Sequence, residues 1–211
     1  MTTLTELRRA VDADFGSRGP TPWPNPHPDR PPLDEEYSRV LDPGKWRIVV
    51  TRAEAWCDAA RDLGVAALEH DVDVRWAVDH GHQHVRVDRL TPLRVSGLPL
   101  LLAYFGFEGV DINAVKLAAG DPAVELTTVP PCGCDACDSG SSEAIDLVDD
   151  HVIGLITGQF RHLTDGARTI VVHSDSGWRA HGHFADDEVD AVLADPLGWQ
   201  ELTGPSWLAD D

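Results

Sequence analysis

The chain is poor in basic residues. Its 211 residues include only 2 lysines and 15 arginines against 36 aspartates and glutamates, which gives a formal net charge of −19. Such a negative balance repels phosphate backbones and anionic lipid headgroups. We therefore expect neither a nucleic acid nor a membrane surface as a partner.

Long apolar runs are missing as well. None approaches the roughly 18–20 consecutive apolar residues that a membrane-spanning helix needs. Residues 1–15 have no apolar core and carry acids at Glu6, Asp12 and Asp14, so they do not match a signal peptide. The sequence therefore predicts a cytoplasmic protein. Its 42% hydrophobic content is enough for a core, and its length corresponds to one domain, or two at most.

Common nucleotide-binding and catalytic motifs are also absent. The chain contains neither Gly-x-Gly-x-x-Gly nor Gly-x-x-x-x-Gly-Lys-Ser/Thr, which counts against Rossmann and P-loop enzymes. It has no Gly-x-Ser-x-Gly elbow for a serine nucleophile. Its motifs therefore favour a protein that is not an enzyme.

The N-terminal part predicts one helix followed by an extended arm. Thr3 and Glu6 fit a capping box ahead of apolar residues at helical spacing, so we expect a helix over 4–14. Seven of the 14 residues in 19–32 are proline, which excludes helix and favours a polyproline-like conformation. We interpret residues 1–33 as a helix with a structural arm; the alternative is an arm that binds an aromatic groove on another protein.

Residues 34–211 have the pattern of a single α+β domain. Apolar residues recur every three or four positions in the helical segments, whereas period-two alternation with short turns predicts antiparallel strands. The expected order is an antiparallel β-meander packed with helices, then a helix, a small antiparallel sheet and a C-terminal helix. The expected helices cover 34–41, 43–63, 142–157 and 186–194, and the expected strands cover 65–78, 84–93, 100–107, 111–117, 123–129, 160–163, 169–173 and 178–184.

Three of the four cysteines lie in one short loop. Cys132, Cys134 and Cys137 have the spacing Cys-x-Cys-x-x-Cys around Gly133, and such a loop can direct several thiolates to one centre. Thiolates select zinc or an iron–sulfur cluster over hard cations, but a closed zinc site needs four ligands. His151, on the helix that follows, is the candidate for the fourth zinc ligand that lies nearest along the chain.

Other interpretations of this loop stay open on the sequence alone. His162, Cys57 or a more distant histidine could take the place of His151. The thiols could also be free, or Cys134 and Cys137 could form a redox-sensitive disulfide. These three interpretations differ in what each sulfur atom is bonded to: a zinc ion, a proton or a second sulfur.

Charged and imidazole side chains near the thiols bear on catalysis. The carboxylates of Asp135 and Asp138 are expected to raise the thiol pKa values, which disfavours a reactive cysteine nucleophile. In an extended strand His80, His82 and His84 would share one face and could form a metal-binding comb, but they fall where a hairpin turn is needed, so we interpret them as solvent-exposed turn residues. His181 and His183 form a second pair that could complete an interstrand metal site in a metal-dependent enzyme.

Several segments resemble a known family. The stretches are Ala-Glu-Ala-Trp at 53–56, Asp-Pro-Ala-Val-Glu-Leu at 121–126 running into the cysteine loop at 132–140, and Gly-Trp-Arg-Ala at 177–180 with Gly182. Together they resemble a family of uncharacterised actinobacterial proteins of unknown function, over about 40–200. The resemblance implies a cytoplasmic bacterial protein and supplies no activity.

The acidity is concentrated in the last part of the chain. Residues 131–211 hold 3 basic and 16 acidic residues, a net charge of −13. We therefore expect a non-enzymatic α+β protein with a structural, zinc-binding cysteine loop and an acidic surface that faces a basic protein partner. The alternative is a metal-dependent or thiol-redox enzyme that uses the cysteine loop with nearby histidines.

Overall fold

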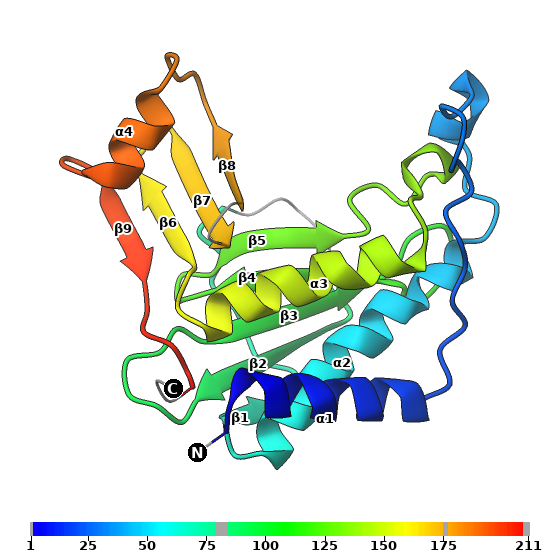
Figure 1. Ribbon diagram of the computed structural model, residues 1–211, viewed down its shortest axis with the longest axis horizontal. Helices are drawn as coiled ribbons and strands as arrows, with labels where there is room; N and C mark the ends of the chain where they lie inside the picture. Colours follow the sequence, from blue (N-terminus) through cyan, green and yellow to red (C-terminus); the bar gives the residue numbers. More distant parts are fainter. Residues whose placement is uncertain (1, 79–83, 175–176, 209–211) are drawn as a thin grey trace.

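The computed structural model describes residues 2–78, 84–174 and 177–208. Within these ranges the chain forms four α-helices and two antiparallel sheets, which confirms the predicted α+β class (Figure 1). No helix of the described part is long and apolar enough to cross a bilayer.

The larger sheet is the predicted meander. Its strands are β1 (Ala66–Glu69), β2 (Arg86–Pro92), β3 (Leu100–Phe105), β4 (Ala114–Ala119) and β5 (Val124–Val129), and they pair antiparallel in that order. Each strand pairs only with its neighbours in the sequence, which is the order of a meander.

The expected strand over 65–78 is wrong beyond Glu69. The alternation of Val72, Val74 and Trp76 does not continue β1; it places these side chains on Leu101 and other residues of the sheet face turned away from the helices. Trp76 adds only an isolated parallel bridge to Ala123. The period-two alternation of apolar residues therefore corresponds to a half-buried extended segment that crosses the sheet, and not to a strand of the sheet.

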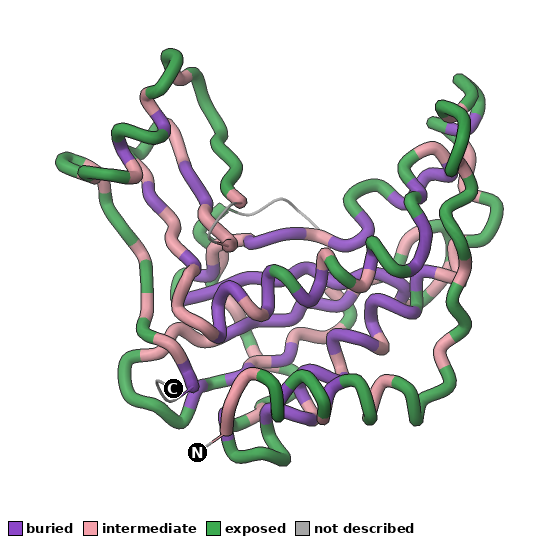
Figure 2. Tube along the Cα trace, in the orientation of Figure 1, coloured by how far each residue is buried: buried purple, intermediate pink, exposed green. Residues whose placement is uncertain are grey.

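Two helices cover the other face of the large sheet. They are α2 (Arg47–Asp62) and α3 (Ser141–Ile156), and α1 (Leu4–Ser17) packs on α2. Figure 2 shows the buried trace running through the large sheet and the facing sides of α2 and α3. Short 3₁₀ turns, η1 (Asp34–Ser38), η2 (Pro43–Trp46) and η3 (Asp135–Cys137), connect these elements near one end of the molecule.

A smaller sheet stands beside the first. It consists of β6 (Arg161–Thr164), β7 (Thr169–Ser174), β8 (Gly177–His181) and β9 (Gln200–Thr203) in the order β8-β7-β6-β9, and α4 (Glu188–Ala194) packs on it (Figure 1). We did not predict β9, which pairs with β6 through a short, mostly exposed sequence.

The close approach of α3 to β7 depends on a glycine. A Cβ atom at Gly154 would lie 1.7 Å from the carbonyl oxygen of His173. The ring of His151, one turn earlier on α3, stacks on the ring of His173 with centroids 4.6 Å apart. This contact joins the two sheets through α3.

The N-terminal residues are part of this architecture. The α1 helix has the predicted capping box at Thr3 and Glu6, and its Leu7 and Val11 are fully buried in the large core. Beyond α1 the arm passes along α2 and reaches the start of α3 (Figure 1). The α1 helix, which lies in the segment 1–33, thus contributes to the same core as residues of the segment 34–211.

Candidate metal centre

The three loop cysteines converge on one point. The sulfur atoms of Cys132, Cys134 and Cys137 all lie within 4.8 Å of one another, and the Cys132 and Cys134 sulfurs are 3.3 Å apart. Cys134 is buried, whereas Cys132 and Cys137 are exposed to solvent. The predicted cluster of three thiols is therefore present, and one side of it faces water.

The backbone of the loop explains this convergence. Gly133 has a φ of +75°, and a Cβ there would lie 2.5 Å from the ring of Phe107, so this turn requires glycine. Cys137 donates its backbone N–H to the carbonyl of Cys134 at 3.1 Å, which closes the 3₁₀ turn η3. The two turns bring residues 132, 134 and 137 to the same side of the loop.

The carboxylate of Asp135 binds the segment that follows η1. Its carboxylate accepts from Arg39 Nε at 2.7 Å and from the backbone N–H of Leu41 at 3.1 Å. Burial opposes ionisation, but these hydrogen bonds outweigh it and lower the pKa of Asp135. The backbone N–H of Asp135 also donates to the Arg39 carbonyl at 2.8 Å, so the contact runs in both directions.

Asp138 holds the arm. Its carboxylate is buried and accepts from the indole N–H of Trp23 at 2.9 Å and from Lys45 Nζ at 2.6 Å. The backbone N–H of Gly140 donates to the same carboxylate at 2.8 Å. Both loop aspartates are thus committed to cations and N–H donors outside the thiol cluster.

The arm is fixed along the loop by further contacts. Trp23 and Ser141 exchange hydrogen bonds, from Trp23 N to Ser141 Oγ at 3.0 Å and from Ser141 N to the Trp23 carbonyl at 3.1 Å. The His27 ring nitrogen Nε2 lies 3.0 Å from the carbonyl oxygen of Asp135. The Trp23 ring also packs edge-on against Trp46 at 5.4 Å. No local sequence pattern predicts these contacts, because Trp23 and Ser141 lie 118 positions apart.

The thiols influence one another's ionisation. Burial raises the pKa of Cys134, but hydrogen bonds from Cys132 and from the backbone outweigh it, so the net pKa is lowered. Interactions with Cys132 and Cys134 raise the pKa of Cys137 to about 12. Ionisation of one thiol therefore opposes ionisation of the next unless a cation is present. The neighbouring sulfurs, rather than the aspartates that we expected, dominate these shifts.

His151 is not brought to the thiols, contrary to the predicted ligand set. It lies ten residues into α3 from Ser141, about 15 Å along the helix axis. Its Nδ1 is 2.8 Å from the Leu147 carbonyl, its ring stacks on His173, and burial lowers its pKa to about 4. Chain distance suggested a ligand, but the direction of α3 carries His151 toward the small sheet.

The other proposed fourth ligands are also remote from the cluster. Cys57 is a buried residue of α2, where burial raises its pKa, and His162 lies on β6 of the small sheet. Of the histidine comb, His80 and His82 fall outside the described residues, whereas His84 stacks on Trp76 at 5.1 Å. In the described part of the chain, the three cysteines form the only group of three or more potential ligands that converge.

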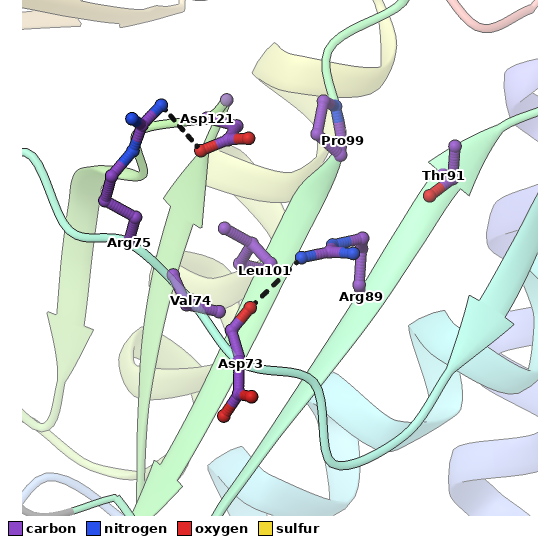
Figure 3. Close-up of a pocket in the computed structure, with 9 residues that line it drawn as sticks. Asp73, Val74, Arg75, Arg89, Thr91, Pro99, Leu101 and Asp121 are labelled. Carbon is purple, nitrogen blue, oxygen red and sulfur yellow. Dashed lines mark hydrogen bonds and ion pairs between the residues drawn. The ribbon is translucent and has the colours of Figure 1, made fainter.

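A cleft of about 750 Å³ lies elsewhere, on the sheet face turned away from the helices (Figure 3). Arg75 and Arg89 line it, but Arg75 pairs with Asp121 at 3.3 Å and Arg89 donates to the carbonyl of Asp73 at 3.3 Å. The lining contains no cysteine or histidine. The cleft therefore offers neither soft ligands nor an excess of positive charge.

The exposed side of α3 carries acidic side chains. Glu143, Asp146 and Asp150 are exposed on this helix. The basic protein partner itself stays a prediction.

Comparison with known proteins places the chain in a family. The model of the family of unknown function DUF6226 matches residues 11–209. No curated protein and no solved structure matches the chain. The match agrees with the resemblance seen in the sequence and extends it to the arm, which the resemblance left out. The chain therefore belongs to DUF6226, a family of unknown function.

Proposed function

We propose that this protein binds one zinc ion on Cys132, Cys134 and Cys137, and that the ion fixes the loop to which the N-terminal arm is attached. The observation that carries the proposal is the convergence of three sulfur atoms within 4.8 Å. Tetrahedral zinc with a Zn–S distance of about 2.3 Å requires sulfurs roughly 3.8 Å apart. The loop can reach that spacing by small side-chain rotations.

Charge supports the same assignment. Three thiols this close cannot all ionise without a cation, as the raised pKa of Cys137 indicates. A divalent soft ion removes that obstacle, because it displaces the protons and is attracted to the thiolates. Zinc binding should therefore be coupled to proton release and to ordering of the loop.

The role we assign to the ion is structural. The loop backbone between the cysteines carries Asp135, and the residue after Cys137 is Asp138, which holds Trp23 of the arm. An ion that fixes the three sulfurs also fixes the backbone that presents both carboxylates. The ion then connects the loop, the arm and the start of α2 without any catalytic step.

Thiol oxidation is the second candidate function. The Cys132 and Cys134 sulfurs are only 3.3 Å apart, and Cys134 has a lowered pKa. A disulfide involving either sulfur would remove zinc ligands, so the oxidised and the zinc-bound forms exclude each other. This relation makes the two functions separable by experiment.

Metal analysis of untagged, reduced protein tests the proposal. We expect one zinc per chain, lost in Cys134→Ser and retained in the matched control Cys57→Ser, whose buried thiol does not join the converging group. A reduced protein that binds no zinc at micromolar concentrations would refute the structural zinc site. Zinc retained by Cys134→Ser at full stoichiometry would show that the ion binds elsewhere.

A further inference from the structure

The zinc centre has three protein ligands, whereas tetrahedral zinc takes four. Resting on the proposed function, we propose that the fourth coordination position binds an exogenous low-molecular-weight thiol as its thiolate. Two observations support this proposal. No other described side chain joins the three sulfurs, and one side of the cluster is exposed to solvent.

The loop carboxylates are not free to fill the fourth position. Asp135 is held by Arg39 and by the backbone N–H of Leu41, and Asp138 is held by Trp23, Lys45 and Gly140. Turning either carboxylate toward the sulfurs would leave a cation or a buried N–H donor without its partner, which is unfavourable.

The described imidazoles do not fill it either. His27, the histidine that contacts the loop, has its Nε2 at 3.0 Å from the Asp135 carbonyl oxygen. His151 is stacked on His173 at the other end of α3. Among the residues with described positions, no histidine, carboxylate or fourth thiol joins the three converging sulfurs.

The open position faces solvent. Cys132 and Cys137 are exposed, whereas Cys134 is buried beneath them. A zinc ion bound to all three sulfurs would therefore be covered by the loop on one side and meet water on the other. A small ligand can reach it without displacing any element of the fold.

The surrounding charges select the class of ligand. The two cations that bind the loop aspartates, Arg39 and Lys45, are both already in ion pairs, so neither is available to hold a carboxylate or phosphate group. Recognition then depends on the metal–ligand bond itself, which favours a soft sulfur donor over oxygen. The three thiolates give the centre a net charge of −1, which disfavours ionising a bound water to hydroxide.

The binding step is a ligand exchange without redox change. The sulfur of the incoming thiol forms a bond to the zinc ion, the bond between zinc and its water breaks, and the S–H proton passes to bulk water. The product is a four-thiolate centre. Because one proton is released for each thiol bound, affinity should rise with pH below the thiol pKa.

Cobalt substitution gives a direct test on the full-length protein. Reduced with a phosphine and loaded with Co²⁺, the protein should show tetrahedral d–d bands and sulfur-to-cobalt charge transfer. Titration with 2-mercaptoethanol should increase the charge-transfer absorbance saturably by about one third, as three thiolates become four. Acetate at the same concentration should change nothing.

The outcomes separate the two proposals. Failure of the protein to bind Co²⁺ or Zn²⁺ would refute the metal centre itself. A cobalt protein whose spectrum is unchanged by 2-mercaptoethanol, or that loses its cobalt to the thiol as measured after gel filtration, would refute the open thiol-binding position and leave the metal centre standing. An equal response to acetate would refute the selectivity for sulfur.

Discussion

Asp138 is the residue through which the cysteine loop holds the arm, so Asp138→Ala is the most informative substitution. The carboxylate is 3% exposed and accepts hydrogen bonds from Trp23, Lys45 and Gly140. Removing one partner of a buried ion pair costs about 3–5 kcal/mol. The Lys45 side chain is 19% exposed and can recover some hydration, which brings the expected loss to about 3 kcal/mol.

Urea denaturation of the reduced, zinc-loaded protein measures this loss. We expect the unfolding midpoint of Asp138→Ala to fall while the slope with urea stays constant, since the surface exposed on unfolding is unchanged. The matched control is Asp146→Ala on the exposed side of α3, which should change stability by less than about 0.5 kcal/mol. The double variant Asp138→Ala with Lys45→Met should lose less than the sum of the two single losses. A loss below about 1 kcal/mol, or full additivity, would refute the proposed anchoring.

Two further predictions concern the junction between α3 and the small sheet. Burial lowers the pKa of His151 from 6.5 to about 4. Below pH 6.5 the unfolded chain therefore binds a proton at this residue that the folded chain does not bind. The free energy of unfolding should fall by up to about 3 kcal/mol as the pH drops from 6.5 to 4. In His151→Phe, measured by thermal melts across this range, that part of the pH dependence should disappear, and an unchanged profile would contradict the assignment. Gly154→Ala should destabilise the protein by about 3 kcal/mol or more, because its Cβ would lie 1.7 Å from the His173 carbonyl oxygen. The control Gly16→Ala, a helical position with no atom within 4 Å, should stabilise it by about 0.5–1 kcal/mol, and equal effects at the two positions would argue against the close packing.

Local patterns were sufficient to predict most of the fold. The apolar spacing of α2 and α3 and the alternation in β2 reflect burial on one face, whereas β3 and β4 are buried on both faces and have largely apolar sequences. Gln200–Thr203 was missed because only one of its four residues is even partly buried. The segment with Val72, Val74 and Trp76 was assigned to a strand because side chains that cover a sheet alternate in the same way as side chains within one.

The candidate site was predictable only in part, for a related reason. Spacing within one loop determines whether Cys132, Cys134 and Cys137 can meet, and they do. Whether His151 can join them depends on the direction of α3, which no local pattern contains. The attachment of Trp23 to Asp138 joins residues 115 positions apart and is visible only in the folded chain.

The central claim is that zinc on the three cysteines fixes the loop and thereby the arm. Hydrogen exchange of the backbone amides in residues 19–33 and 132–141, with zinc bound and after chelation, tests it most directly. We predict that chelation accelerates exchange in both segments at once, including the Ser141 amide that donates to the Trp23 carbonyl, while α4 is unaffected. Equal protection of the arm with and without zinc would contradict the account.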